Sequence, residues 1–378
     1  MSLTIDDFAT RFHEEPGYLD FAAVGPPGET VRAEAEAFQT LLEGGRFGAF
    51  GSLFDQDARM RAAVSRLTGF RPEQISVQPS TSQALMHVLF GLTGGVALSP
   101  AEFPSLPFAA MRAQEALGVV APQWLTSDHG RVTPGNIREQ LHASTVAVAV
   151  SLVDFRTGHL VDLEGIRQVI GDRLLIVDAM QGFGVVEAPY QLADVVAAGS
   201  QKWARAGWGA GFLALSDRAL EHLTPVWSGF TGSTHEGLPL DEVPPPSDDA
   251  RAYTIAPVDP LAMARMAAAL EELARVGIGA VNARLAQRVS DVIDIADEFA
   301  LPVVSPRAEA ERAGIVVVQP EPERLTVLAA ALHNHGVSVT VRQGAVRISP
   351  HVSTTSDTLE LLRSALLSYA TATASSSR

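Results

Sequence analysis

The chain has 378 residues, of which 47% are hydrophobic and 19% are charged, so it is long and apolar enough to bury a large core and a smaller second one. Its formal net charge of -15 makes nucleic acid and anionic membranes poor partners. No apolar run reaches the length of a membrane span and the N-terminus lacks a signal-peptide pattern, which predicts a cytoplasmic protein.

Cysteine is absent from the sequence. A chain without cysteine forms no disulfides, offers no thiolate to a metal and has no cysteine nucleophile. His333 and His335 lie close together near the end of an expected helix, but no further ligands occur at metal-binding spacing. We therefore expect no metal site.

The first half of the chain alternates expected helices and strands, as in an α/β fold. A polar, helix-prone segment (residues 1–16) is followed by a short strand and turn at 18–26. A helix at 29–43 leads into a glycine-rich loop, 44–52, which we expect to be mobile. The elements that follow are a helix at 57–68, a strand at 75–79, a helix at 83–92, strands at 95–99 and 144–153, and a helix at 162–170.

Three residues with hydroxyl groups, Ser80, Thr81 and Ser82, stand between the strand at 75–79 and the helix that follows it. Free backbone N–H groups and the positive end of the helix dipole favour an anion at such a place, and the hydroxyls add donors. In isolation, an ordinary helix cap is the commoner explanation of a serine and threonine cluster.

The centre of the chain is the stretch 175–215. An apolar run ends in Asp178, and a second apolar segment at 193–198 leads to Lys202, before a strand at 211–215. Parallel strands end at the same edge of a sheet, so Asp178 and Lys202 are expected to lie at one rim. A lysine can form a Schiff base with an aldehyde cofactor, and a buried acid can keep a pyridine nitrogen protonated. Taken singly, the aspartate suits a helix cap and the lysine a solvated surface.

Glycines at 207, 209 and 211 are too closely spaced for a dinucleotide fingerprint and do not lead from a strand into a helix, which argues against a nicotinamide enzyme. A proline-rich acidic linker covers residues 242–249. Beyond it we expect helices at 260–275, 281–299, 323–335 and 358–369, and strands at 314–319, 338–342 and 347–351.

These elements predict two domains. The large one covers residues 16–245, and a small α+β domain covers residues 250–370 together with residues 1–15. The polar tail, 371–378, is expected to be disordered.

The segment Asp178-Ala179-Met180-Gln181, followed by Gly199-Ser200-Gln201-Lys202, resembles the pyridoxal-phosphate core of class V aminotransferases. That superfamily also contains cysteine desulfurases, kynureninases and isopenicillin N epimerases, and the resemblance covers roughly residues 18–366. It implies the α/β architecture of fold type I enzymes that bind pyridoxal 5'-phosphate. Their large domain has a mostly parallel seven-stranded sheet sandwiched by helices, and a small C-terminal α+β domain is added to it.

The resemblance also implies a set of cofactor-binding residues. Lys202 would carry the cofactor and Asp178 would hold its ring nitrogen, with Gln181 and Gln201 beside them. Phe103, in a Phe-Pro-Ser segment like that of kynureninases, would stack on the ring, although it would also be unremarkable as a core residue. The phosphate would lie at Thr81 and Ser82, and the segment 227–233 resembles one that reaches the phosphate of a neighbouring subunit. The remaining implied contacts are Thr231 and Gly232, in a homodimer with shared sites.

Two further places concern the substrate. Arg347, in Arg-x-Ser-Pro, matches the arginine that holds the α-carboxylate in kynureninases and epimerases, and Arg342 is the competing candidate. Either could equally be a surface residue at a strand end. Phe155 occupies a place where members often have asparagine or tyrosine near the cofactor's phenolic oxygen, and Arg156 has Asp154 as an alternative partner. The roles of Phe155 and Arg156 stay open.

The function implied is a class V aminotransferase-like reaction at the Cα of a small amino acid, through an internal aldimine on Lys202 and a quinonoid intermediate. The alternatives are a C–S, C–Se or kynureninase-like C–C lyase, or an epimerase. A non-catalytic relative of the fold is disfavoured by the intact Asp178, Gln181 and Lys202. Because desulfurases hold sulfur on their own cysteine, the absence of cysteine predicts that the chain is not a persulfide-forming cysteine desulfurase.

Overall fold

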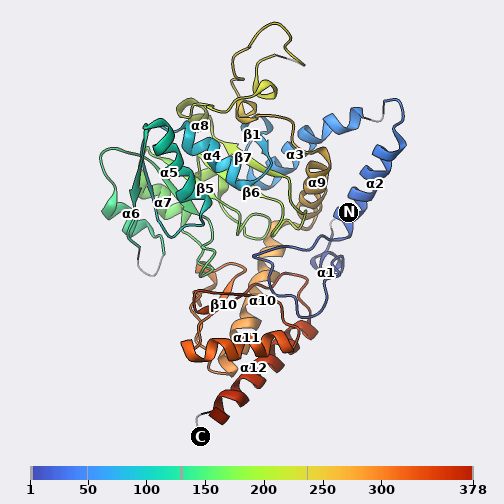
Figure 1. The fold of residues 1–378 in the computed structure, drawn as a ribbon, viewed down its shortest axis with the longest axis vertical. Coiled ribbons are helices and arrows are strands. Elements are labelled where there is room, and N and C mark those ends of the chain that lie inside the picture. Colours follow the sequence, from blue (N-terminus) through green and yellow to red (C-terminus); the bar gives the residue numbers. More distant parts are fainter. Residues whose placement is uncertain (1–2, 49, 128–130, 236, 377–378) are drawn as a thin grey trace.

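A seven-stranded sheet is the centre of the upper lobe in Figure 1. The computed structural model describes residues 3–48, 50–127, 131–235 and 237–376. The strand order is β1-β7-β6-β5-β4-β2-β3, and among these strands β7 alone runs antiparallel to its neighbours, which confirms the predicted, mostly parallel sheet. In spatial order the strands are β1 (Ile75–Gln78), β7 (Gly211–Leu215), β6 (Val195–Gly199), β5 (Leu174–Asp178), β4 (Thr145–Ser151), β2 (Gly94–Leu98) and β3 (Val120–Trp124).

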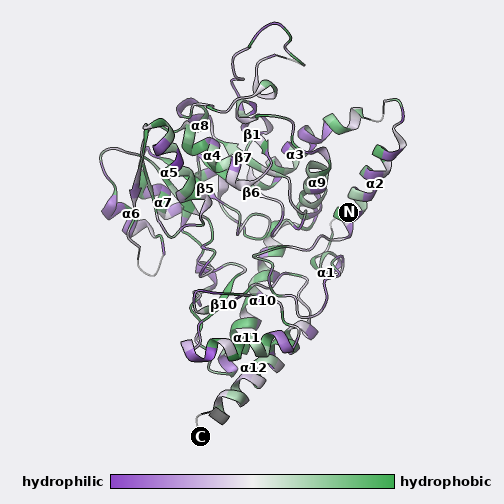
Figure 2. Ribbon diagram, in the orientation of Figure 1, coloured by the Kyte–Doolittle hydropathy of each residue, from purple (hydrophilic) through white to green (hydrophobic). Residues whose placement is uncertain are grey.

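Alternate residues of the central strands pack into separate apolar clusters on the two faces of the sheet. In β4, Val148 and Val150 belong to one cluster, and Ala147 and Ala149 to the other, as the two-residue period of a strand requires. Burial on both faces explains why these strands are almost uninterrupted apolar runs. The first cluster includes α3 (Gly51–Thr68), α6 (Pro134–Gln140), α7 (Leu163–Ile170) and α9 (Pro260–Val276). The second includes α4 (Thr81–Gly91), α5 (Ser105–Leu117) and α8 (Asp217–His222). Hydrophobic and hydrophilic residues alternate along these helices (Figure 2).

The lower lobe contains a three-stranded antiparallel sheet, in the order β8 (Val316–Val318), β10 (Ala345–Ile348) and β9 (Thr340–Arg342). The helices α10 (Ile278–Glu298), α11 (Leu325–Asn334) and α12 (Ser356–Ser376) accompany it (Figure 1). This is the small α+β unit that the resemblance implied. The N-terminal helix α1 (Ile5–Ala9) lies near the junction of the lobes, and Tyr18 and Asp20 form bridges to Ser338 and Ser349.

The helices α2 (Glu29–Gly44) and α3 both pack against α9 in the upper lobe (Figure 1). The helix α9 was expected to belong to the small domain, which was predicted to begin at residue 250. It packs against helices of the upper lobe instead. Both predicted domain boundaries stay predictions.

Several elements differ from the prediction. The strand β3 was not expected, because its sequence contains Pro122 and lacks a continuous apolar run. Its half-exposed residues are typical of an edge strand. The helix α3 begins at Gly51, inside the expected glycine-rich loop, of which residue 49 lies outside the described residues. The helix α12 continues to Ser376 where a disordered tail was predicted, and the Thr373 hydroxyl donates to the carbonyl of Tyr369. Residues 377–378 of that tail lie outside the described residues.

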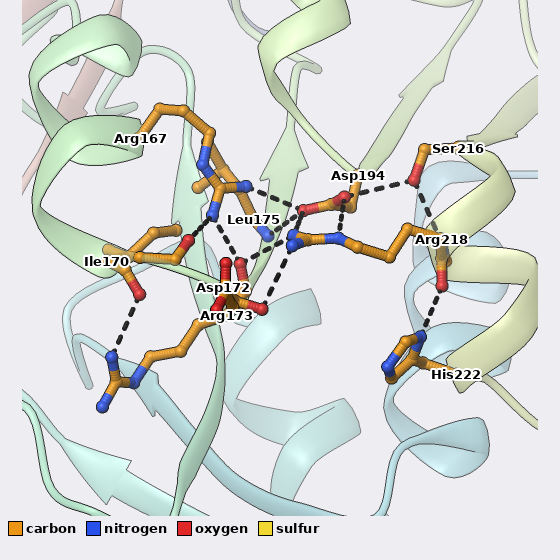
Figure 3. Close-up of polar contacts among 11 residues, drawn as sticks. Arg167, Ile170, Asp172, Arg173, Leu175, Asp194, Ser216, Arg218 and His222 are labelled. Atoms are coloured by element: carbon orange, nitrogen blue, oxygen red, sulfur yellow. Dashed lines mark hydrogen bonds and ion pairs between the residues drawn. The ribbon is translucent and has the colours of Figure 1, made fainter.

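Asp194 organises the end of the sheet from which β5 and β6 start (Figure 3). Its buried carboxylate accepts hydrogen bonds from Arg167 (2.9 Å), from two nitrogens of Arg218 (2.6 and 3.0 Å) and from the backbone N–H of Leu175 (2.8 Å). Two arginines from α7 and α8 thereby compensate one buried charge, as a buried carboxylate needs. The network fixes both helices to the strands.

In the part of the chain that the structure describes, no helix combines the length and the apolar character needed to cross a membrane.

Candidate active site

Asp178 and Lys202 lie at the edge of the sheet opposite Asp194. Asp178 is the last residue of β5, and Lys202 follows β6 by three residues. The two strands are parallel and in register, with Asp178 opposite Ala197, so the chain leaving β6 passes beside the carboxylate. The expected meeting of these two side chains therefore follows from the parallel pairing.

The carboxyl of Asp178 is 3% exposed and accepts a hydrogen bond from the backbone N–H of Met180 at 2.9 Å. Burial raises the pKa of Asp178, while that hydrogen bond and the charge of Lys202 oppose the rise. A buried carboxyl of this kind needs a nearby cation to ionise, and a protonated ring nitrogen is such a cation. The site of Asp178 thus fits the pyridine ring of the expected cofactor.

Burial lowers the pKa of Lys202 to about 8. Asp178 acts in the opposite direction, whereas the positive charges of Arg347 and Arg342 lower the pKa further. A lysine with this pKa supplies a substantial fraction of neutral amine near physiological pH, which is the form that attacks an aldehyde. The environment of Lys202 is therefore suited to holding an aldehyde cofactor.

Two phenylalanines lie next to Lys202. The amine Nζ is 5.1 Å from the centre of the Phe103 ring, and Phe103 meets Phe155 edge to face with ring centres 5.2 Å apart. Phe103 is 36% exposed, so its ring keeps uncovered surface on which a flat cofactor ring can stack. Phe155 lies beside Phe103, and its predicted place near the phenolic oxygen of the cofactor stays a prediction.

Glu102 is a site residue that the sequence analysis did not single out. Its carboxylate accepts a hydrogen bond from the backbone N–H of Ser151, at the end of β4, at 3.1 Å. Burial raises the pKa of Glu102 to about 7, and repulsion by Asp154 and Asp178 contributes. The sequence could have identified Glu102, because this carboxylate stands directly before Phe103 and just after the end of a buried strand.

The hydroxyl cluster lies at the N-terminus of α4. Ser80 is the helix cap, because its hydroxyl accepts from the N–H of Gln83 at 3.2 Å, which agrees with the ordinary explanation for that residue. Thr81 donates to the sulfur of Met180 at 3.2 Å, and the hydroxyl of Ser82 is 2.7 Å from that of Ser105.

Gly199 shows that Thr81 and Gln201 converge. A Cβ at Gly199 would lie 2.8 Å from Oε1 of Gln201 and 3.0 Å from Oγ1 of Thr81, so a larger residue would displace the Gln201 side chain. A helix N-terminus with a nearby hydroxyl and amide is a suitable cradle for a phosphate group. Its side chains therefore fit the expected cofactor.

Gln181 is used differently from the expectation. Its amide nitrogen donates to the carbonyl of Ala22 at 3.0 Å, and its oxygen accepts from the indole of Trp203 at 2.9 Å. Both ends of the amide are thus engaged with protein groups. Gln181 joins the N-terminal segment to the loop after Lys202 rather than facing an open site.

A buried ion pair lies behind that loop. Arg205 is 2% exposed and pairs with Glu14 at 2.5 Å, and it also contacts His351 and Ser353 at 3.0 and 2.9 Å. Its backbone has a φ of 54°, the left-handed region that a non-glycine residue enters at a cost. The pair connects the N-terminal segment, the Lys202 loop and the lower lobe.

The segment 227–233 has its contacts elsewhere. Gly232 approaches the carbonyls of Arg251 and Thr254 so closely that a Cβ would meet them at 2.7 and 2.8 Å. The hydroxyls of Thr231 and Ser228 are buried and have no hydrogen-bond partner among the described residues. The structure therefore does not bring Thr231 and Gly232 into contact with Lys202, and their role toward a second subunit stays a prediction.

The two arginines predicted to bind substrate both come from the lower lobe. Arg347, on β10, is 6% exposed and lies 3.3 Å from Asp20 and 3.1 Å from the hydroxyl of Thr340. Arg342, on β9, donates to the carbonyl of Phe155 at 3.1 Å and lies over the Phe155 ring at 4.7 Å. Neither is a fully exposed surface residue.

Comparison with known proteins gives the family context. The profile described as "Aminotransferase class-V" matches residues 52–374. An "uncharacterized aminotransferase" of Bacillus subtilis (strain 168) is 24% identical over 79% of this chain and 79% of its own length. A "probable hercynylcysteine sulfoxide lyase" of Mycobacterium tuberculosis (strain CDC 1551 / Oshkosh) is 27% identical over 93% of this chain and 88% of its own.

Solved structures share the fold. A cysteine desulfurase from Thermococcus onnurineus NA1 superposes with a TM-score of 0.81 at 20% identity, covering 92% of this chain and 93% of that one. The cystine C–S lyase C-DES, in complex with its product cysteine persulfide, has a TM-score of 0.82 at 18% identity, covering 93% and 97%. Glycine is covalently linked to the PLP cofactor in a further C-DES structure. The matching family and these neighbours indicate pyridoxal 5'-phosphate as the cofactor of the chain.

These structures correct one expectation. The absence of cysteine predicted that the chain is not a persulfide-forming cysteine desulfurase, yet cysteine desulfurases are among its structural neighbours. The product of C-DES is itself a persulfide. When sulfur leaves on the product, the enzyme needs no thiol of its own, so the missing cysteine does not support the exclusion.

Proposed function

The chain belongs to the class V aminotransferase family, and we propose that it is an enzyme that uses pyridoxal 5'-phosphate to act at the Cα of a small amino acid. The observation that carries this proposal is the pairing of Lys202, whose pKa is lowered to about 8, with the buried Asp178 at one edge of the sheet. The coarse function is transfer or cleavage at an amino acid, in line with relatives named as an aminotransferase and a lyase.

The cofactor, when bound, supplies an aldehyde that condenses with amines and a ring that accepts the electron pair released at Cα. Lys202 is the amine that would hold the aldehyde, and Asp178 would keep the ring nitrogen protonated. Phe103 would cover one face of the ring. The phosphate would lie against Thr81, Ser82 and Gln201 at the N-terminus of α4.

Lys202 would also move the proton of the reaction. Once a substrate amine is bound in its place, the free amine of Lys202 would accept the Cα proton. A base with a pKa of about 8 is close to the operating pH, where a general base is most effective. Arg347 would hold the α-carboxylate and thereby orient the Cα–H bond.

A lyase reaction is the second candidate. It is supported by the relative named as a probable sulfoxide lyase, which aligns with 93% of this chain. The geometry of Lys202 and Asp178 suits both reactions, because each begins with removal of the Cα proton.

The test is the visible absorption spectrum of the purified protein beside that of Lys202→Ala. We expect an absorption band in the wild type, or on addition of pyridoxal 5'-phosphate, that is lost or altered in the variant. Amino acids are then screened for shifts of this band. Keto acid formed only with an amino acceptor indicates transamination, whereas pyruvate and ammonia without an acceptor indicate elimination. A wild type that gains no band from added cofactor contradicts the proposal.

A homodimer is proposed as the working assembly. Phe47 and Phe54, near the junction of α2 and α3, are 109% and 81% exposed, and large exposed apolar side chains are typical of surfaces that another chain covers. Light scattering measures the mass directly. A monomer at micromolar concentration would contradict this assembly.

A further inference from the structure

Three arginines line a cavity of about 140 Å³ between the lobes. Arg342 and Arg347 come from β9 and β10 of the lower lobe, and Arg156 follows β4 of the upper one. The amides of Gln319 and Gln343 also line it. All of these polar groups can donate hydrogen bonds, so the lining is suited to an anion.

The positive charge of this cavity is only partly compensated. Arg156 pairs with Asp154 at 3.0 Å, and Arg347 has Asp20 at the longer distance of 3.3 Å. Arg342 forms no ion pair in the described part of the chain, and its partners are the carbonyl and the ring of Phe155. Three guanidinium groups therefore face two carboxylates.

Two donors of the arginines that line the cavity are also unused. The Nε atoms of Arg156 and Arg347 are buried and have no hydrogen-bond partner among the described residues. The Arg347 side chain is more than nine-tenths buried. Burying a donor without an acceptor costs free energy, which an incoming oxyanion would recover.

Two phenylalanines connect the cavity to the reactive lysine. Phe155 accepts hydrogen bonds from Arg342 (3.1 Å) and Arg347 (3.4 Å) through its carbonyl, and its ring contacts Phe103. Phe103 in turn lies beside Lys202. The charges of both lower-lobe arginines act on the pKa of Lys202, which agrees with this short path.

We propose that the cavity binds a second acidic group, so that the substrate is an amino acid whose side chain ends in an oxyanion. This rests on the proposed function, in which Arg347 holds the α-carboxylate. Arg342, together with Arg156, holds the side-chain acid. A guanidinium fork matches a planar carboxylate with two parallel hydrogen bonds, and the small volume suits a short side chain.

The first test needs no catalysis. Binding of succinate and of butyrate to the holoenzyme is measured by calorimetry, since the two differ in one carboxylate. We expect succinate to bind at least about tenfold more tightly than butyrate, and Arg342→Gln to remove this difference. Arg324→Gln, at an exposed arginine of the same lobe, is the control and should retain it. Equal binding of both acids to the wild type overturns the inference.

The second test compares aspartate and glutamate with their amides asparagine and glutamine as substrates. We expect a preference for the acids of at least about tenfold in kcat/KM, and we expect Arg342→Gln to bring the ratio of acid to amide close to one. If the amides react as well as the acids and the reaction still requires Lys202, the inference fails and the proposed function stands. If no amino acid shifts the absorption band and no cofactor binds, the proposed function fails instead, and succinate binding decides the inference alone.

Discussion

The amine of Lys202 lies 5.1 Å from the centre of the Phe103 ring. This distance places the ring where a cofactor held by Lys202 would meet its face. We expect Phe103→Ala to raise the dissociation constant for pyridoxal 5'-phosphate about fivefold, because an aromatic pair contributes about 1 kcal/mol beyond its buried area. Phe103→Tyr keeps the ring and serves as the control. Titration of the cofactor-free protein, followed by absorbance, measures both, and an unchanged constant in Phe103→Ala would rule out stacking.

The lowered pKa of Lys202 predicts how cofactor incorporation depends on pH. Only the neutral amine attacks the aldehyde, so the rate of incorporation should rise with pH and level off above about 8. The charge of Asp178 raises the pKa of Lys202, hence Asp178→Asn should move the midpoint to lower pH. Stopped-flow absorbance across pH 6 to 10 gives the midpoints. A midpoint near the ordinary lysine value, about 10.4, would show that the amine is not desolvated.

Glu102 predicts a pH dependence of stability. Its pKa is raised to about 7 in the folded state, so between about pH 4.5 and 7 the native chain binds more protons than the unfolded chain. The free energy of unfolding therefore falls as pH rises through this range. Glu102→Gln removes the effect and keeps an acceptor for Ser151. We expect the variant to lose about 2.5 kcal/mol less than the wild type between pH 5 and 8, measured by urea unfolding. Parallel curves for the two proteins would refute this.

Arg205 allows a paired test of charge and backbone strain. Arg205→Ala leaves Glu14 buried without its partner, which should cost about 3–5 kcal/mol of unfolding free energy. Arg205→Gly removes the same contact but accepts the φ of 54° freely, so it should be less destabilising by about 1 kcal/mol. Chemical denaturation of both variants measures the difference. If glycine were no better than alanine, the backbone at 205 would carry no strain.

Asp194 provides a variant that affects stability but not the site. Asp194→Ala leaves Arg167 and Arg218 without their buried carboxylate, and we expect a loss of about 3–5 kcal/mol. Because Asp194 lies at the other end of the sheet, the folded variant should bind cofactor with an unchanged constant. A large change in cofactor affinity would mean that the two edges of the sheet are coupled.

Local sequence patterns determined the central part of this protein. The apolar runs that end at Asp178 and before Lys202 predicted buried parallel strands, and parallel strands bring their carboxyl ends to one edge. The position of both groups, and that of Phe103 after its own strand, could therefore be predicted. The position of the hydroxyl cluster at Ser80–Ser82 could also be predicted from the sequence, since the start of a helix is a local feature.

Tertiary packing decided what lies around that centre. Gln181 stands in the expected motif, yet its amide forms hydrogen bonds with Ala22 and Trp203. Ala22 is distant in sequence, and Trp203 lies on a different loop. The arginine cavity joins Arg156 to Arg342 and Arg347, nearly two hundred residues later, and only the docking of the lobes sets their distances. Periodicity specifies which face of an element is buried, whereas the partner of a polar side chain depends on which elements pack against it. For that reason the cofactor and the two arginines Arg342 and Arg347 could be expected from the sequence, whereas the cavity that these arginines form with Arg156 could not.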